Sequence, residues 1–116
     1  MPLLTADSSI DPVSLKNVPD KFIIFYSSVV GGELWCPDCQ DVQDLVKKTF
    51  DTPDSPSALI VYVGDRSQWK ARSNIYRGDP WKIESIPTII KLKNGKEEGR
   101  LVLQEIQDQL VSFALD

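Results

Sequence analysis

Short apolar runs in the chain alternate with stretches in which apolar residues recur at helical spacing. The runs Phe22–Tyr26 and 58–63 are continuously apolar and rich in β-branched and aromatic residues, which is typical of strands buried on both faces. Thr88–Lys93 and residues 100–103 predict two further strands, joined by a hairpin turn at Asn94-Gly95. A first strand at residues 3–4 is short or absent.

Four stretches predict helices. A short helix is expected from Asp11, as N-cap, and Pro12 to about Pro19. Residues 37–50 have apolar residues at helical spacing, namely Val42, Leu45, Val46 and Phe50. Residues 67–76 are weakly helical, and residues 104–115 place four apolar residues on one face: Ile106, Leu110, Val111 and Ala114. Residues 27–34, which contain Gly31-Gly32, are expected to form a flexible loop.

The elements follow the order strand, helix, strand, helix, hairpin, helix. Buried strands linked by helices, with an antiparallel hairpin after them, predict an α/β fold: a three-layer α/β/α sandwich with a mixed central sheet. The chain has 116 residues and no repeat, linker or low-complexity stretch. We therefore expect a single domain over residues 1–116.

Composition and charge exclude several classes of function. Thirteen Lys and Arg against seventeen Asp and Glu give a net charge of −4, which disfavours binding to nucleic acid or an anionic membrane. The apolar runs are far shorter than the ~20 residues that cross a bilayer, and no basic region precedes an apolar core at the N-terminus, so we expect a cytoplasmic protein. Because histidine is absent, Ser-His-Asp and Cys-His catalysis are excluded.

Two cysteines, Cys36 and Cys39, enclose Pro37-Asp38 at the start of a predicted helix, after a buried strand and a loop. In this context C-x-x-C is typical of a redox motif. Free amide groups and the positive end of the helix dipole at Cys36 favour the thiolate, which is the nucleophile. Cys39 lies one turn later on the same face, close enough to attack a mixed disulfide. The sequence predicts a catalytic pair with Cys36 as nucleophile and Cys39 as resolving cysteine.

Three other interpretations of the pair remain open. A structural disulfide is disfavoured in a cytoplasmic chain. Half of a metal site would leave zinc short of four ligands unless the protein dimerised, because no histidine is present; no metal is expected. Buried, inert cysteines are disfavoured because the intervening Pro-Asp indicates an exposed helix start.

The residues between the cysteines are expected to tune the reduction potential. Pro37 suits the first helical turn because it lacks a backbone N–H. The Asp38 carboxylate disfavours a second negative charge beside it, which destabilises the reduced form and lowers the reduction potential. We therefore predict a reducing protein.

A second candidate region is Ile86-Pro87, immediately before a predicted strand. One interpretation is a simple turn into that strand. The other is a cis bond whose loop faces the cysteines, with the Ile86 backbone pairing with an extended substrate. Trp35, which precedes the first cysteine, is either an apolar contact surface for substrate or a core aromatic residue packed under the loop.

Several separated motifs coincide with one known family. They are W-C-P-D-C at 35–39, Y-V-G-D-R at 62–66, W-K at 69–70, Asn74, Y-R at 76–77 and I-P-T at 86–88. From about residue 22 to the C-terminus, the chain resembles the thioredoxin domain-containing protein 17 family of the thioredoxin superfamily. The resemblance implies a thioredoxin-like fold and a cytosolic disulfide reductase.

The resemblance also implies substrates, partners and roles. It implies a restricted set of substrates (cystine, S-nitrosothiols and selected proteins), with peroxidase activity as well. No cofactor is bound, because the electrons come from NADPH through thioredoxin reductase, and a monomer is expected. The implied roles are Cys36 as nucleophile, Cys39 as resolving cysteine, and Ile86 and Pro87 as the substrate-facing loop.

Two positions depart from ordinary thioredoxin. Thioredoxin has a buried aspartate in the strand before its motif, and Phe22–Tyr26 contains no acid. The proton acceptor for Cys39 is therefore open between Asp38 and water. Counting from Pro87, Leu103 falls where thioredoxin has a glycine that lines its groove, which would narrow access for large proteins.

Two other classes of function remain alternatives. One is a glutathione-dependent, glutaredoxin-like transferase, which the acidic surface disfavours because glutathione is an anion. The other is a redox-gated binding module that holds a partner in the same groove without turnover.

Overall fold

The central sheet is built from five strands in a mixed arrangement. The computed structural model describes residues 3–6, 12–19 and 21–115. The strand order is β1 (Leu3–Thr5), β5 (Ala58–Tyr62), β2 (Phe22–Tyr26), β6 (Thr88–Lys93) and β7 (Lys96–Val102). The first three of these strands run parallel to one another, and β6 and β7 are antiparallel to their neighbours. The predicted mixed sheet is confirmed, including the short first strand.

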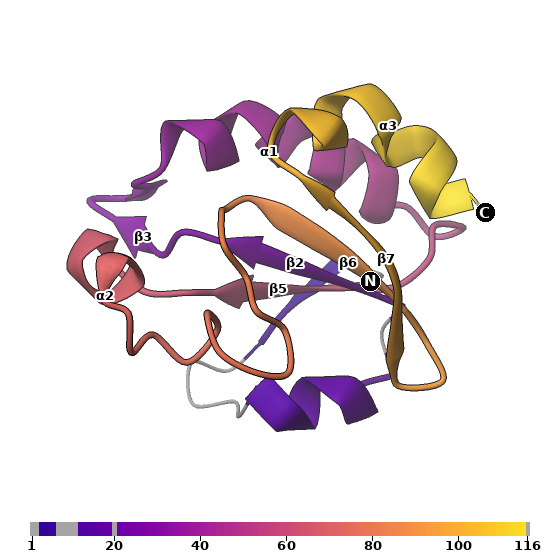
Figure 1. Ribbon diagram of the computed structural model, residues 1–116. Coiled ribbons are helices and arrows are strands. Elements are labelled where there is room, and N and C mark those ends of the chain that lie inside the picture. The colour runs from indigo at the N-terminus through magenta and orange to yellow at the C-terminus, as the bar shows by residue number, and fades with distance from the viewer. Residues whose placement is uncertain (1–2, 7–11, 20, 116) are drawn as a thin grey trace.

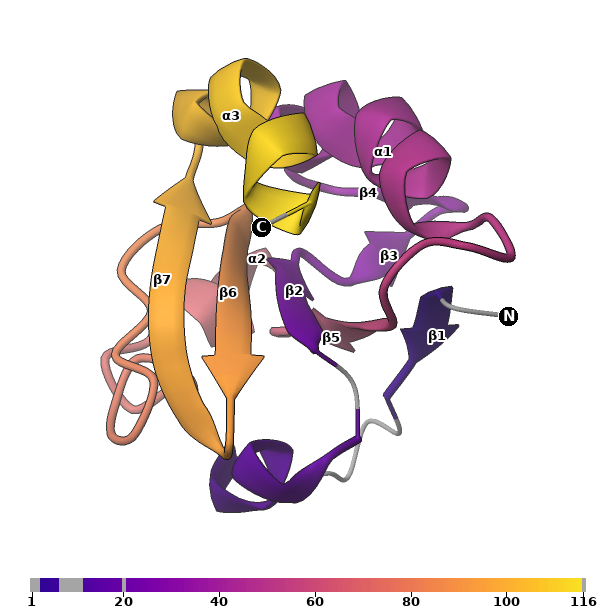
Figure 2. The ribbon, with the colours of Figure 1, turned by 90° about the vertical axis from the view of Figure 1, so that its right-hand side faces the viewer.

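Helices cover both faces of this sheet, as Figures 1 and 2 show. The helices α1 (Pro37–Phe50) and α3 (Gln104–Leu115) lie side by side on one face. On the other face lies η1 (Pro12–Asn17), and α2 (Arg66–Lys70) follows the end of β5. The chain therefore forms the predicted three-layer sandwich. No helix in the described ranges has the length and apolar character needed to cross a membrane.

The strand β2 connects the two sides of the core. All five of its residues are buried, as expected for a strand with a layer on each face. The Phe22 ring packs against Phe50 of α1 and Phe113 of α3, at centroid distances of 5.0 and 5.7 Å. Phe25 points to the opposite face and packs 6.3 Å from the Trp81 ring. These contacts fix the end of β2. A connecting segment, residues 27–35, then leads to Cys36.

The connecting segment contains a hairpin, although a flexible loop was predicted for residues 27–34. The hairpin consists of β3 (Val29–Val30) and β4 (Glu33–Leu34), paired antiparallel. Gly31 and Gly32 form its turn with φ angles of +63° and +86°. Two successive positive φ values are what a tight type I′ hairpin turn requires, and glycine adopts them at little steric cost. The Gly-Gly pair therefore indicates a turn here.

The predicted helices differ from the observed ones at three places. The first, η1, is a 3₁₀ helix that ends at Asn17, and the predicted N-cap Asp11 lies outside the described residues. In α3, Val111 is exposed, whereas the sequence placed it on the buried face. Phe113, half-buried, packs on the core instead, with its ring against Phe22.

The predicted helix over 67–76 is limited to α2. It begins with a capping box in which Asp65 accepts from the Gln68 N–H and the Gln68 side chain accepts from the Asp65 N–H. Ala71 has extended backbone angles and ends the helix. The Asn74 side chain then donates to the carbonyls of Val63 and Gln68, at 2.9 and 3.0 Å. These bonds fold the chain after α2 into a turn.

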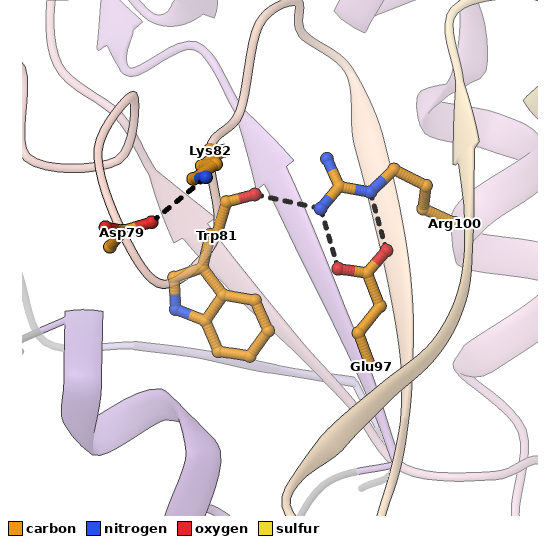
Figure 3. Close-up of polar contacts among 5 residues, drawn as sticks. All are labelled: Asp79, Trp81, Lys82, Glu97 and Arg100. Atoms are coloured by element: carbon orange, nitrogen blue, oxygen red, sulfur yellow. Dashed lines mark hydrogen bonds and ion pairs between the residues drawn. The ribbon is translucent and has the colours of Figure 1, made fainter.

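A polar clamp holds the segment that leads to Pro87. Arg100 donates two hydrogen bonds of 2.7 Å to Glu97 and one of 2.8 Å to the carbonyl of Trp81 (Figure 3). The Trp81 indole donates in turn to the Pro12 carbonyl at 2.8 Å. The segment before β6 is thus tied both to β7 and to η1, which fixes the approach to the Ile86-Pro87 loop.

Candidate active site

Cys36 is the N-cap of α1, and Pro37 occupies the first helical turn, as predicted. The Cys36 carbonyl accepts the Gln40 N–H at 3.1 Å and so begins the helical hydrogen bonds. Its sulfur makes no capping hydrogen bond to the helix amides. The Cys36 Sγ lies 3.9 Å from the carbonyl oxygen of Ile86, toward which the thiol donates. The sulfur therefore faces the Ile86-Pro87 loop, although the sequence predicted that it would face the free amides.

The two cysteines, both free thiols, differ in their access to solvent. Cys36 retains 8% exposure, whereas Cys39, one turn further into α1, has none. Both sulfurs are close enough to interact, since the Cys36 side chain contributes to the raised pKa of Cys39. The exposed helix start that the sequence predicts is found at Pro37 and Asp38, whereas both cysteines are buried. The small exposed fraction belongs to Cys36, so a molecule in solution would meet the first cysteine before the second.

Burial, with a smaller contribution from Cys36, raises the pKa of Cys39 to about 12. Ser27 works in the opposite direction. Its backbone N–H donates to the Cys39 Sγ at 3.5 Å, and hydrogen bonds from the Ser27 backbone and side chain both lower the pKa of Cys39. The Ser27 Oγ also accepts the Cys36 N–H at 3.2 Å. One fully buried serine, just past the end of β2, therefore contacts both cysteines.

No carboxylate lies on β2, as the sequence shows, and a phenol lies near Cys39. The Tyr26 hydroxyl is buried and has no hydrogen-bond partner among the described residues. Burial raises the pKa of Tyr26 well above its usual range, and Cys39 raises it further. Tyr26 is therefore a neutral neighbour of Cys39, unable to act as a base at physiological pH.

The Ile86–Pro87 peptide bond is cis, and its loop faces Cys36, as the second interpretation of this segment predicts. Both side chains are buried, so the loop offers its backbone to a ligand. The Leu103 N–H donates to the Pro87 carbonyl at 3.0 Å. Leu103 itself has a φ of +54° and is 37% exposed. A leucine side chain thus projects beside the loop from a conformation that favours glycine.

Trp35 is half-buried and is held at the surface by contacts with the loop after β5. Its indole N–H donates to the Gly64 carbonyl at 2.8 Å, and the same oxygen accepts the Ser28 N–H at 3.1 Å. Gly64 has a φ of +118°, and a Cβ there would lie 2.8 Å from Gln68 Cβ. The Arg66 guanidinium stacks 4.7 Å from the centre of the Trp35 ring. Trp35 therefore forms part of the surface next to Cys36.

The structure thus brings Trp35, Cys36, Pro37, Cys39 and the Ile86-Pro87 loop together. Asp38 lies exposed in the first turn of α1. In the described ranges no group of three or more cysteine or acidic side chains is placed to hold a metal ion.

Two contributors were missed by the sequence analysis. Ser27 was counted as a loop residue, and its place directly after a buried strand that leads to the C-x-x-C pair is the only signal for it. Arg66 was noted only as the last residue of the Y-V-G-D-R motif, and its contact with Trp35 was not predicted because it links residues 31 positions apart.

A three-layer fold with a Cys-x-x-C pair beneath a cis-proline loop defines a thioredoxin-like protein. Solved structures agree with this fold. Thioredoxin f2 of Chlamydomonas reinhardtii superposes with a TM-score of 0.61 at 21% identity, covering 96% of this chain and 92% of that one. A Schistosoma mansoni thioredoxin pre-protein superposes with a TM-score of 0.58 at 18% identity, covering 98% and 99%.

The family follows from the sequence comparison. The model of the thioredoxin domain of thioredoxin domain-containing protein 17-like proteins matches residues 8–115, so the chain belongs to this family. The thioredoxin-like protein Clot of Arabidopsis thaliana is 30% identical over 84 residues, which cover 69% of this chain and 63% of that protein. Human thioredoxin domain-containing protein 17 is 31% identical over 67 residues, covering 56% and 53%.

These matched regions span less than two thirds of either relative. Membership of the family implies a function of the thiol–disulfide oxidoreductase type.

Proposed function

We propose that this protein is a cytosolic disulfide reductase with a Cys36-Pro37-Asp38-Cys39 active site, recycled by NADPH-dependent thioredoxin reductase. Its substrates would be a restricted set of disulfides, comprising cystine and selected proteins, together with S-nitrosothiols. Reduction of hydroperoxides at the same pair would accompany this activity. The observation that carries the proposal is the asymmetry of the two cysteines: Cys36 keeps a small exposed fraction beside a cis-proline loop, and Cys39, one turn further into α1, has none.

The reaction needs no group beyond the two thiols. The Cys36 thiolate attacks a substrate disulfide RS–SR′, forms a mixed disulfide with RS, and releases R′S⁻, which takes up a proton. The Cys39 sulfur then attacks the Cys36 sulfur, which closes the intramolecular disulfide and releases RSH. Two electrons have passed from the dithiol to the substrate. Thioredoxin reductase returns two electrons from NADPH to the Cys36–Cys39 disulfide.

The Leu103 side chain supports a restricted range of protein substrates. A protein disulfide must be presented on an extended segment that lies along the Ile86-Pro87 backbone. Leu103 is bonded to Pro87 through its N–H and projects at this place. It would obstruct a bulky segment more than a small disulfide.

Arg66 supports small disulfides that carry carboxylates. Its guanidinium is held over the Trp35 ring, next to Cys36, and its Nη2 lies 3.5 Å from the Trp35 carbonyl. In the described part of the chain, no carboxylate forms an ion pair with Arg66. Its remaining N–H groups are available to a carboxylate of cystine. The positive charge of Arg66 would therefore attract an anionic disulfide next to Cys36, even though the chain as a whole has a negative net charge.

The proposal is tested by NADPH consumption in two coupled assays. One contains thioredoxin reductase and cystine; the other contains glutathione, glutathione reductase and cystine. We expect the protein to stimulate the first and not the second. Stimulation of only the second assay would identify a glutathione-dependent transferase. Stimulation of neither, with S-nitrosothiols and hydrogen peroxide also inert, would contradict the proposed function.

A further inference from the structure

Ser27 is the residue that joins the two cysteines. It has no solvent exposure and lies immediately after β2. Its backbone N–H points at the Cys39 Sγ, at 3.5 Å. Its Oγ accepts the Cys36 N–H at 3.2 Å. Ser27 therefore contacts the Cys39 sulfur directly, and the hydrogen bond from the Cys36 backbone orients its side chain.

The Ser27 hydroxyl still has its own proton to donate. A serine hydroxyl accepts through two lone pairs and donates one hydrogen. Because the Cys36 N–H occupies an acceptor position, the hydroxyl hydrogen remains free to point to the neighbouring sulfur. The Ser27 side chain is close enough to the Cys39 sulfur to lower the pKa of Cys39, as a hydroxyl that donates to it would do.

The surroundings of Cys39 offer little else to stabilise negative charge. Two titratable groups face it, Cys36 at the start of α1 and Tyr26 on β2. Cys36 raises the pKa of Cys39, and Cys39 raises the pKa of Tyr26, so neither group stabilises a thiolate at Cys39. Asp38, exposed in the first turn of α1, carries a carboxyl group and offers no N–H donor from its side chain. A thiolate formed at a sulfur with no solvent exposure depends on hydrogen-bond donors from the protein.

We propose that Ser27 is a further catalytic residue, whose backbone N–H and hydroxyl together stabilise the Cys39 thiolate as it attacks the mixed disulfide on Cys36. This inference rests on the proposed function and adds a role for a residue outside the Cys-x-x-C motif. It also supplies what β2 lacks: two neutral donors stand where no carboxylate is present.

The balanced step is Cys39–SH + Cys36–S–S–R → Cys36–S–S–Cys39 + RSH. The S–H bond of Cys39 and the S–S bond to the substrate break, and a new S–S bond and the S–H bond of RSH form. The proton passes to the departing RS⁻, directly or through water. Ser27 neither gains nor loses a proton overall, because it only donates hydrogen bonds to the sulfur while that sulfur carries charge.

A single-turnover experiment separates the two steps. Reduced protein is mixed with dithiobis-nitrobenzoate, which releases one coloured thiolate when Cys36 attacks and a second when Cys39 resolves the mixed disulfide. In Ser27→Ala, we expect the second release to slow about tenfold at neutral pH, the loss expected for one hydrogen bond to a charged group. The pH profile of this step should move upward by about one unit, since one pKa unit corresponds to a tenfold change.

Two variants separate this role from a structural one. Ser27→Thr keeps the hydroxyl and should restore most of the second release. Ser28→Ala removes a neighbouring hydroxyl that bonds the Gly64 N–H at 2.9 Å; it should lower thermal stability and leave the ratio of the two rates unchanged. If Ser27→Ala does not fold, Ser27→Val and Ser27→Thr, which have nearly the same shape, supply the same comparison.

The inference is overturned if Ser27→Ala resolves at the wild-type rate with an unchanged pH profile. It is also overturned if both releases slow equally and threonine restores neither. If the wild-type protein gives no first release at all, the proposed function fails, and this outcome is distinct from failure of the role assigned to Ser27.

Discussion

The two sides of Cys36 differ in what surrounds the sulfur. On the inner side lie Ser27 and Cys39, both without solvent exposure and joined by a hydrogen bond from the Ser27 backbone N–H to the Cys39 Sγ. On the outer side lie Trp35, Arg66 and Leu103, which are exposed or half-buried side chains. If the protein has the proposed function, the inner side determines how the disulfide exchange is completed, and the outer side determines which substrates begin it. Changes on the inner side should therefore alter rates for all substrates, and changes on the outer side should alter preference among them.

The largest effect is expected from Cys39→Ser, on the inner side. Without the resolving sulfur, a mixed disulfide at Cys36 has no intramolecular exit, so turnover with thioredoxin reductase should fall by at least about 100-fold. Mass spectrometry should show the substrate thiol covalently retained. Retained activity with glutathione would indicate a monothiol enzyme, and unaltered binding of a partner without any trapped adduct would indicate a binding module.

The second effect concerns pH and also belongs to the inner side. Since burial raises the pKa of Cys39 to about 12, its thiolate fraction increases with pH throughout the neutral range. The resolving step should accelerate about tenfold per pH unit between pH 7 and pH 9. The second release from dithiobis-nitrobenzoate measures this slope. A rate that levels off near pH 8 would show that Cys39 ionises far more readily than its burial indicates.

The third effect tests the outer side through Arg66→Gln. Loss of one exposed charge interaction should raise the KM for cystine about fivefold, in line with about 1 kcal/mol for such contacts. Cystamine has the same disulfide without carboxylates, and its KM should not change. Arg66→Lys, which keeps the charge, should lie between the two. Equal changes for both disulfides would mean that Arg66 acts only by holding Trp35 in place.

A smaller effect is expected from Leu103→Gly. Glycine adopts the φ of +54° without strain and removes the projecting side chain. Reduction of a protein disulfide such as that of insulin should increase about threefold, a change well within the usual range for one hydrophobic side chain. The rate with cystine serves as the control and should stay the same. An unchanged insulin rate would exclude Leu103 as a barrier to protein substrates.

The smallest effect is expected from Asp38→Asn, which lies between the two sides. Removal of the carboxylate should stabilise the reduced dithiol and raise the reduction potential by about 10 mV, which is about a twofold change in the equilibrium constant, since 30 mV corresponds to tenfold. Equilibration of both redox forms with glutathione buffers measures the shift. A potential that stays the same or decreases would remove Asp38 as a determinant of the reducing poise.

The inner and outer sides also differ in how far the sequence could predict them. The strand Phe22–Tyr26 and the helix Pro37–Phe50 are local patterns, so the position of the cysteines at a helix start was predictable. The role of Ser27 was not, because it depends on two short contacts with residues 9 and 12 positions away. A serine after a strand carries no information about such contacts.

Short elements were predicted less well than long ones, for a related reason. The hairpin β3–β4 has only two residues in each strand, too few for an alternating pattern to be visible. The extent of α2 was overestimated because side-chain hydrogen bonds from Asn74 to distant carbonyls end the helical path. In both places tertiary contacts, which single-residue preferences do not encode, decide the local structure.

Gly64 gives the outer side an unusual dependence on a single atom. Its carbonyl oxygen is shared by the Trp35 indole and the Ser28 backbone, and its own conformation leaves no room for a side chain beside Gln68. A side chain at position 64 would clash with Gln68, so the backbone would have to move, and with it the oxygen that holds both Trp35 and Ser28. An exposed charge on this face, such as that of Arg66, can therefore be substituted alone, whereas the positions of Trp35 and the hairpin depend together on one glycine.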